Sequence, residues 1–340
     1  MKVRFGFVAM SVILENASPS KTMTYASFSK LNDRQAAIGR LEQIAQQNLH
    51  STLRLLKHAH GNDVKLYRLT SKLIPLATHD GLAGWDPYPI LADDFKAVGD
   101  YALEKGIRVS LHPDHFCVLS TPRPEVLANS IKDLEYHVDM LEAMGLDERS
   151  KCNIHMGGAY GDKITSSARF IEQFSSLPDR LKHRITLEND DKTFNVEETL
   201  IAAEAVSVPM VLDIHHHAVN PGHITDEMLT EQFWPRIQGT WERELHRLKL
   251  SSLEQLPVKI HVSSPKSISD PRGHADLVEV APVLKFLRAI ASKASHVDCM
   301  LEAKSKDQAV FQLMDELKQL ALTSDDISII DDASIEIKTQ

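Results

Sequence analysis

Histidines and carboxylates that could bind metal follow short apolar runs at intervals along this 340-residue chain. The runs end in Leu111-His112, Ile154-His155, Leu187-Glu188, Leu212-Asp213, Ile260-His261 and Leu301-Glu302. If these runs are parallel strands of one barrel, their final side chains meet at one face of it. Imidazole and carboxylate without thiolate suit manganese, zinc or iron. The pattern therefore predicts a site for more than one metal ion.

A single histidine at a strand end is more often a hydrogen-bonded structural group than a ligand, so the argument rests on the whole set. That set comes from six strand ends and consists of His112, His155, Glu188, Asp213, His216, His261 and Glu302. Burying several ionisable groups together is costly unless they are paired or coordinate metal. Few cations stand beside them in the sequence, which favours metal.

The three carboxylates of this set, Glu188, Asp213 and Glu302, could each bridge two ions. Bridged ions suit phosphodiester hydrolysis, in which they activate a water and stabilise the leaving oxygen. His79, beyond the second strand, and His274, in the loop after the seventh, are expected at the same end of the barrel. The consecutive histidines at positions 215 to 217 cannot all bind, because successive residues leaving a strand point in different directions.

Lys259 stands two residues before His261, so on a strand both side chains face the same way, into the barrel. Metal ions would repel a protonated lysine there, and burial and nearby positive charge lower a lysine pKa. One hypothesis is that Lys259 is neutral, or carbamylated and able to bridge metals. The alternative is an ordinary lysine paired with a nearby carboxylate.

The elements that must position these residues alternate between short apolar runs and helical patterns. We expect strands at Val3–Val8, Val64–Leu69, Arg108–Leu111, Cys152–His155, Ile185–Glu188, Met210–Asp213, Val258–Val262 and Val297–Glu302. Helical periodicity lies between them, for example over Asp33–His58, Pro124–Met144 and Val196–Val206, the last with Asn195 as N-cap. Eight alternations over residues 1–320 predict a single (β/α)8 TIM barrel. The Gly-rich loop typical of an open dinucleotide-binding sheet does not follow the first run.

Residues 321–340 differ in character, since acidic residues alternate with isoleucines there. We expect a C-terminal extension that is either a loose tail or an added edge strand, and we assign it no chemistry.

Composition limits the classes of function. The net charge of −9 argues against a broad basic surface for nucleic acid, although bound divalent cations would add local positive charge. Three scattered cysteines predict free thiols, buried at Cys152 and Cys299, as in a reducing cytoplasm. No stretch approaches the roughly 20 apolar residues of a membrane span. We expect a cytoplasmic protein.

Several strings of residues closely resemble the UV damage endonucleases of bacteria and fungi. They are Leu76-Ala77-Thr78-His79, His155-Met156-Gly157-Gly158-Ala159-Tyr160-Gly161, Thr186-Leu187-Glu188-Asn189-Asp190-Asp191-Lys192-Thr193, Asp213-Ile214-His215-His216-His217, Lys259-Ile260-His261-Val262-Ser263-Ser264-Pro265-Lys266 and Leu301-Glu302-Ala303-Lys304. The resemblance runs in order from about Val3 to Gln319. It is stronger than the resemblance to apurinic endonucleases, which share the barrel and a three-metal site.

The resemblance implies an enzyme that nicks double-stranded DNA immediately 5′ of cyclobutane pyrimidine dimers and (6-4) photoproducts, leaving a 3′-hydroxyl and a 5′-phosphate. It implies divalent metals, typically manganese and three per chain, with Glu188, Lys259 and Glu302 as catalytic residues. The implied ligands are His79, His112, His155, Glu188, Asp213, His216, His261, His274 and Glu302. The family pattern also picks His216 from the three consecutive histidines and places its metal-site lysine at Lys259, which supports carbamylation.

The resemblance further implies that two loops insert into damaged DNA, one around residues 15–18 and one over residues 113–116. The expected DNA-contacting residues are Phe7, Asn16, His115 and Phe116. This chain departs from the family at two of them, because the family commonly has tyrosine at Phe7 and glutamine at His115. Contacts to the DNA backbone are expected from Lys21, Lys266 and Arg272, for which solvated surface charge is the alternative.

Three alternatives remain open at this point. An apurinic-site endonuclease would use the same barrel, and a metal-dependent sugar isomerase would use similar ligands with fewer metals. A damage-binding scaffold without catalysis would have no reason to keep the ligand set. We expect a monomer that associates with the nucleoid when it is bound to DNA.

Overall fold

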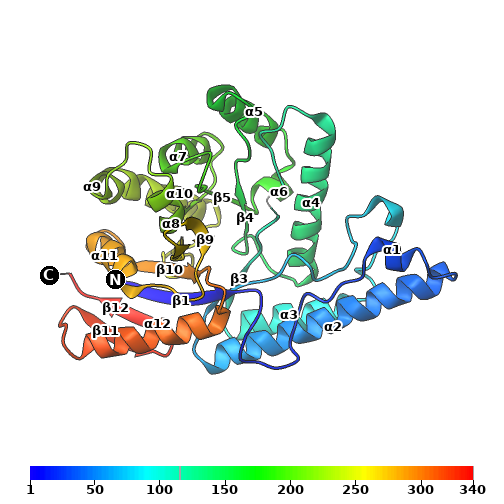
Figure 1. The fold of residues 1–340 in the computed structure, drawn as a ribbon, viewed down its shortest axis with the longest axis horizontal. Helices are drawn as coiled ribbons and strands as arrows, with labels where there is room; N and C mark the ends of the chain where they lie inside the picture. The colour runs from blue at the N-terminus through cyan, green and yellow to red at the C-terminus, as the bar shows by residue number, and fades with distance from the viewer. Residues whose placement is uncertain (115, 340) are drawn as a thin grey trace.

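Eight parallel strands form a nearly closed barrel in the computed structural model, which describes residues 1–114 and 116–339 (Figure 1). The strands are β1 (Lys2–Val8), β2 (Leu66–Arg68), β3 (Arg108–Ser110), β4 (Cys152–His155), β5 (Ile185–Glu188), β6 (Met210–Asp213), β7 (Val258–Val262) and β10 (His296–Leu301). Neighbours pair in parallel register, and β3 joins β4 through a bridge between Leu111 and Cys152. The predicted (β/α)8 fold is confirmed, and each of the eight predicted strands overlaps an observed one.

Helices follow the strands and cover the outside of the barrel (Figure 1). They are α1 (Tyr25–Phe28), α2 (Arg34–Gly61), α3 (Ala92–Glu104), α4 (Pro124–Ala143), α5 (Lys163–Ser175), α6 (Asp179–Lys182), α7 (Val196–Ala205), α8 (Ile214–Val219), α9 (Asp226–Met228), α10 (Trp234–Arg247), α11 (Val280–Ile290) and α12 (Lys306–Ala321), with a 3-10 turn η1 (Asp80–Leu82) and a π-helical turn η2 (Leu229–Phe233). Asn195 caps α7 as predicted, because its side chain accepts from Glu198 N while the Glu198 carboxylate accepts from Asn195 N. Among the helices of the described ranges, none is long and apolar enough to cross a membrane.

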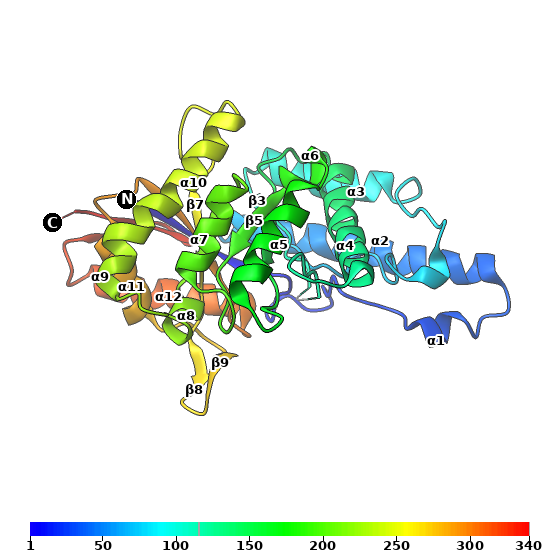
Figure 2. The ribbon, with the colours of Figure 1, turned by 90° about the horizontal axis from the view of Figure 1, so that it is seen from above.

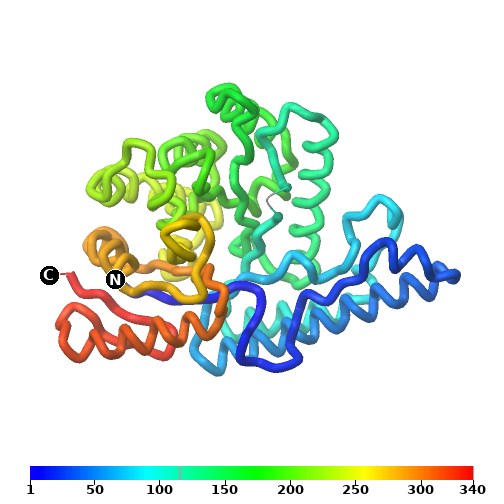
Figure 3. Tube along the Cα trace, viewed as in Figure 1, coloured from blue at the N-terminus to red at the C-terminus, as the bar shows by residue number. Residues whose placement is uncertain are grey.

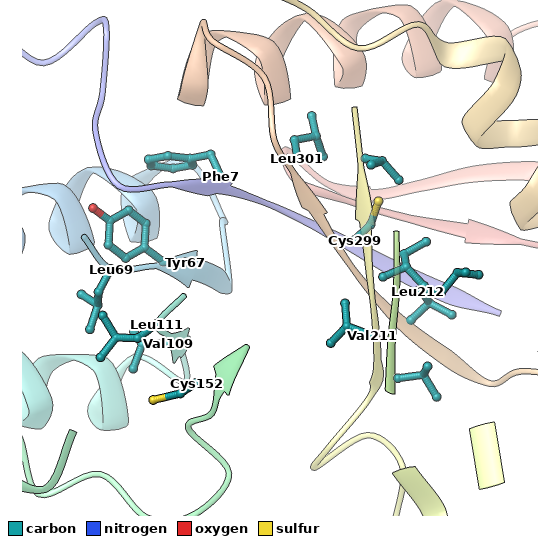
Figure 4. Packing of buried hydrophobic residues seen from close by; sticks show 14 of the residues in the cluster. Phe7, Tyr67, Leu69, Val109, Leu111, Cys152, Val211, Leu212, Cys299 and Leu301 are labelled. Atoms are coloured by element: carbon teal, nitrogen blue, oxygen red, sulfur yellow. The ribbon is translucent and has the colours of Figure 1, made fainter. Parts of the chain in front are cut away.

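The barrel strands are buried on both faces, which explains why they read as continuous apolar runs. In β1 the rings of Phe5 and Phe7 are fully buried, and Phe7 packs edge to face against Tyr67 of β2 with centroids 5.2 Å apart (Figure 4). Cys152 and Cys299 are buried free thiols, as expected.

The C-terminal segment forms a β-hairpin, so the added-strand alternative describes it and the loose tail does not. Strand β11 (Ile327–Asp331) pairs with β12 (Ser334–Ile337), and β12 runs antiparallel to the first half of β1. The backbone N–H of Ile337 donates to the Met1 carbonyl, and the two ends of the chain lie close together (Figure 3). The hairpin thereby covers the edge that the first residues of β1 would otherwise expose.

A second hairpin is inserted after β7, where we had expected only a loop. Strand β8 (Pro265–Ser267) pairs antiparallel with β9 (Asp270–His274), and both project from the body of the molecule (Figure 2). Ser267, Ser269 and Asp270 are polar turn-formers, so the turn chemistry was visible in the sequence, but the strands are too short and polar to read as such.

Candidate metal centre

Glu188, the last residue of β5, is the centre of the cluster at the carboxyl ends of the strands. Its side chain is buried, and its Oε1 lies 2.9 Å from Nδ1 of His261. Its Oε2 lies 3.2 Å from Nε2 of His112 and accepts from the Asn153 amide. Burial alone would raise the pKa of Glu188, but His261, His155 and His112 hold it well below its usual range, so the carboxylate is anionic.

Glu302 supplies a second anionic carboxylate beside the first. Its Oε1 lies 2.9 Å from the same Nδ1 of His261 and accepts from the Arg68 guanidinium. Burial opposes ionisation, but Arg68 and His261 hold the pKa of Glu302 well below its usual range. His261 therefore lies between two carboxylates that come from β5 and the end of β10.

Asp213, the last residue of β6, is the third carboxylate and the N-cap of α8. Its Oδ1 accepts from the backbone N–H of His216 at 2.8 Å. Its backbone is held by the Asn189 side chain, which donates to the Asp213 carbonyl and accepts from the Asp213 N–H. Its Oδ2 is buried, and none of the described residues donates to it. A buried carboxylate oxygen left without a donor is the kind of group that a metal ion satisfies.

Three histidine rings around the carboxylates are oriented by backbone carbonyls. The Nδ1 atoms of His112, His155 and His216 lie 2.9, 3.2 and 2.9 Å from the carbonyl oxygens of Pro113, Glu188 and Asn189 respectively. A carbonyl acceptor on Nδ1 fixes the tautomer and leaves Nε2 of each ring as the possible metal ligand, an arrangement common at metal sites.

Two groups of donor atoms lie close enough together to hold an ion. They are His112, His155 and Glu188, and Glu188, Asp213 and His261, with the donor atoms within 4.8 Å of one another in each group. Glu188 belongs to both groups, so its two oxygens can serve two ions. The nitrogen and oxygen donors together with the unsatisfied Asp213 oxygen fit a divalent transition metal.

The three consecutive histidines separate as expected, because they lie on the short helix α8. Only His216 turns toward the carboxylates, with Nδ1 3.7 Å from both Glu188 Oε1 and Asp213 Oδ2. His215 uses Nδ1 on the Ser263 hydroxyl and Nε2 on the Pro271 carbonyl. His217 faces a separate, mostly apolar cavity of about 800 Å³.

Lys259 is buried in β7, and its Nζ donates to the Ser110 hydroxyl at 2.9 Å. Burial and the charges of Arg108 and Arg68 hold the pKa of Lys259 well below its usual range. No carboxylate among the described residues lies within salt-bridge distance of this Nζ, so the structure offers no support for the paired-lysine alternative.

Two predicted ligands lie at or beyond the edge of the cluster. His274 stands on β9, with Nδ1 3.9 Å from Glu302 Oε2 and its ring 6.2 Å from that of His216. His79 is exposed, its Nδ1 accepts from Gly81 N, and its ring stacks on Tyr25 at 3.9 Å. The contacts in the described parts of the chain do not bring His79 into the cluster.

The predicted DNA-contacting residues fall into two groups, those that the structure exposes and one that it buries. Asn16 is exposed, with φ 54° and its carbonyl bonded to Arg54, and the Phe116 side chain is 72% exposed. Phe7 is fully buried against Tyr67, so a DNA contact by Phe7 is not supported and its role in this structure is packing. His115 lies outside the described residues.

Sequence reasoning missed the polar residues that hold the ligands, namely Arg68, Ser110, Asn153 and Asn189. A signal was present for two of them. Ser110 and Asn153 each stand two residues before a predicted histidine ligand, the same offset that drew attention to Lys259. On a strand that offset places both side chains on one face.

A cavity of about 430 Å³ gives access to the cluster from the barrel mouth. It is lined by residues that include His112, His155, His216 and His274 from the cluster and Lys192 and Arg272 from surrounding segments. The cluster therefore faces a recess whose wall carries the cations Lys192 and Arg272 together with Asp114, Asp190 and Asp191.

Comparisons with known proteins agree with this arrangement. The UV-endonuclease UvdE family matches residues 3–335. Curated proteins named UV DNA damage endonuclease match from Halalkalibacterium halodurans, at 40% identity over 99% of both chains, and from Bacillus velezensis, at 41% identity over 94% of this chain and 95% of that one. The crystal structure titled SacUVDE superposes with a TM-score of 0.76 and 28% identity, over 94% of this chain and 99% of that chain. Endonuclease IV from Thermus thermophilus, at a TM-score of 0.53 and 12% identity over 94% and 100% of the two chains, shares the fold. The chain belongs to the UV-endonuclease UvdE family.

Proposed function

We propose that this chain is a metal-dependent DNA repair endonuclease that nicks double-stranded DNA immediately 5′ of UV photoproducts, both cyclobutane pyrimidine dimers and (6-4) photoproducts. Family membership and the names of the relatives support the UV-damage substrate. The observation that carries the metal chemistry is the pair of donor groups that share Glu188, together with the buried Asp213 Oδ2 of the second group, to which none of the described residues donates.

The proposed ligands are His79, His112, His155, Glu188, Asp213, His216, His261, His274 and Glu302, for up to three ions, with manganese as the proposed metal. Bound divalent ions supply Lewis-acid stabilisation of the scissile phosphate and acidify the attacking water. Carbamylated Lys259 remains a proposal, supported by the burial that lowers the pKa of its amine.

The chain's own residues prepare the site. Arg68 and Asn153 hold the carboxylates of Glu302 and Glu188 in place, so the anionic oxygens need no reorganisation when an ion or a phosphate arrives. At the wall of the recess, Arg272 and Lys192 can contact the phosphates on either side of the scissile bond. These contacts would position the DNA strand without reading its sequence.

Lesion recognition is proposed to depend on deformation rather than on base identity. Photoproducts weaken pairing and stacking, so extruding them costs less than extruding normal bases. The exposed Phe116 ring and the exposed loop at Asn16 can insert into the opened duplex and stabilise it. His115 and Lys21 stay in this proposal as expectations from the resemblance.

We propose a monomeric cytoplasmic enzyme, which sedimentation of the chain alone and with duplex DNA would test.

The deciding experiment incubates the chain and manganese with end-labelled duplexes carrying a thymine dimer, a (6-4) product or an abasic site. A nick immediately 5′ of the dimer, absent from Glu188→Gln and from reactions with EDTA, is the expected result. Cleavage of the abasic duplex alone would mean an apurinic-site endonuclease. Binding of the dimer duplex without cleavage by the metal-loaded chain would mean a damage-binding scaffold.

A further inference from the structure

The β8–β9 hairpin carries a fully exposed isoleucine at its tip. Ile268 lies between the hydroxyl side chains of Ser267 and Ser269, and the hairpin projects away from the barrel (Figure 2). A single exposed apolar residue is common on protein surfaces. Ile268 differs from such residues because its hairpin is anchored to the barrel by His215 and has its base beside the candidate metal centre.

The hairpin is held rigidly to the barrel by buried His215. One ring nitrogen bonds the Ser263 hydroxyl at the end of β7, and the other bonds the Pro271 carbonyl on β9 at 2.8 Å. Within the turn, Asp270 Oδ1 accepts from Gly273 N at 3.1 Å. An element fixed in this way loses little conformational entropy when it binds a partner, so the tip is preorganised for contact.

The base of the hairpin is continuous with the candidate metal centre. His274, the last residue of β9, lies 3.9 Å from Glu302, and Arg272 lines the recess in front of the cluster. An extended strand rises about 3.3 Å per residue, so Ile268 lies at most about 20 Å along the chain from His274. That reach corresponds to about six base pairs at 3.4 Å each. DNA seated at the metal centre would pass within reach of the tip.

The charges around the hairpin suit a polyanion. Lys266 and Arg272 are about half exposed on its two strands, and Lys304 is exposed beside its base. Lys266 pairs with Asp270 at 3.4 Å, and Arg272 lies 3.7 Å from Asp191, both loose enough for phosphates to compete. Asp270 and Asp191 partly offset Lys266 and Arg272, so phosphates would have to displace these carboxylates.

We propose that the β8–β9 hairpin is a third DNA-binding element, in which Ile268 packs as an apolar wedge into the groove of the duplex several base pairs from the lesion while Lys266 and Arg272 hold nearby phosphates. Apolar wedge residues stabilise bent and partly unstacked DNA without reading its sequence. This inference rests on the proposed function and deepens it. It adds a contact several base pairs from the scissile bond to the two loops already expected there.

The test compares wild type with Ile268→Ala and Ile268→Leu, and uses Leu322→Ala as the matched control. Leu322 is a 77% exposed apolar residue at the end of α12, on the opposite side of the barrel from the metal centre. Affinity is measured with manganese present, on a thymine-dimer duplex whose scissile linkage cannot be hydrolysed. The fluorescence of a 2-aminopurine placed about six base pairs from that linkage reports unstacking by the tip.

The Ile268→Ala chain is expected to bind the dimer duplex about ten-fold more weakly, which is about 1.4 kcal/mol, and to lose the 2-aminopurine signal. The Ile268→Leu chain should restore most of both, and Leu322→Ala should match wild type. Equal affinity and equal signal for wild type and Ile268→Ala would overturn the wedge. If wild type binds but does not nick a cleavable dimer duplex, the proposed function fails while the affinity comparison still decides the hairpin. A chain that binds no duplex overturns both.

Discussion

The backbone N–H of His216 donates to Oδ1 of Asp213 at 2.8 Å, while Asp213 Oδ2 stays buried without a donor among the residues that the structure describes. One carboxylate therefore caps helix α8 with one oxygen, and its other oxygen is available to the candidate metal centre. Burial raises the pKa of this carboxyl to about 7, so the metal-free site holds a partly protonated Asp213. Its structural and chemical roles can be separated by substitution.

Asp213→Asn should reduce manganese affinity by at least about ten-fold, because it removes the unsatisfied anionic oxygen. The fold should persist, since the asparagine Oδ1 still accepts from His216 N and keeps the cap. Calorimetric titration measures the affinity, and circular dichroism with thermal melting checks the fold. Wild-type affinity in Asp213→Asn would remove Asp213 from the ligand set, and a collapsed melting curve in metal-free buffer would show that its role is structural.

Metal binding should release protons, and its apparent affinity should rise between pH 7 and 9. Burial alone would lower the pKa values of His216 and His261, but the surrounding carboxylates raise both to about 9. Both rings are therefore protonated at pH 7 without metal, and a ligand must lose its proton to bind. Titrations in buffers of different ionisation enthalpy should give about two protons released from the two rings at pH 7, plus a fraction of a proton from Asp213, with the total falling as the pH passes 9. No proton release at pH 7 would contradict these raised values.

The barrel was predictable because each buried parallel strand is a short apolar run with an abrupt polar end. Strands β4 to β7 begin and end at the predicted residues, and most other strand ends shift by one or two positions. The candidate metal-binding cluster was predictable for the same reason, since Glu188 and His261 stand where an apolar run gives way. Their residue types mark them even before the fold is known.

The supporting contacts were harder to predict, because they join residues far apart in the chain. Arg68 of β2 reaches Glu302 at the end of β10, with β1 lying between the two strands, and His215 holds Pro271 on an inserted hairpin. No local pattern links such pairs. Phe7 is the reverse case, since the resemblance implies a DNA contact for a ring that is buried against Tyr67 in the barrel.

Lys259 is expected to react with carbon dioxide. Burial and the charges of Arg108 and Arg68 hold the pKa of Lys259 well below its usual range, which favours the neutral amine, and a neutral amine adds to carbon dioxide to form a carbamate with release of one proton. Protein equilibrated with ¹³C-bicarbonate should show one carbamate carbon signal that is missing from Lys259→Met. If NMR and gentle intact-mass measurement show an unmodified Lys259 amine at neutral pH, the carbamate proposal is wrong.

Asp298→Asn should destabilise the barrel by roughly 3–5 kcal/mol, because it leaves a buried guanidinium unpaired. Asp298 is fully buried and accepts from Arg4 Nε and Arg108 Nη1, both at 2.7 Å. Equilibrium unfolding in urea measures the loss. The matched control is Asp100→Asn, in an exposed pair with Lys96, for which the change should stay below about 1 kcal/mol. Equal effects of the two substitutions would show that the buried network contributes no more than a surface pair.

His215→Phe should loosen the β8–β9 hairpin without disturbing the barrel. Phenylalanine fills a similar volume but loses the bonds to Ser263 and Pro271, and two buried hydrogen bonds contribute about 2 kcal/mol. Hydrogen exchange of amides in residues 265–274 should accelerate by about 30-fold, while β4 to β7 keep wild-type protection.

His217→Phe is the control for the loss of the anchor, because Nδ1 of the neighbouring His217 is buried without a hydrogen-bond partner among the described residues. It should leave hairpin exchange unchanged. Because a loosened hairpin binds DNA with a larger entropic cost, His215→Phe should also raise KM for the dimer duplex more than it lowers kcat. Equal exchange in the two variants would mean that His215 is not the anchor. A selective loss of kcat would instead mean that His215 acts on the metal centre through His216 or His274.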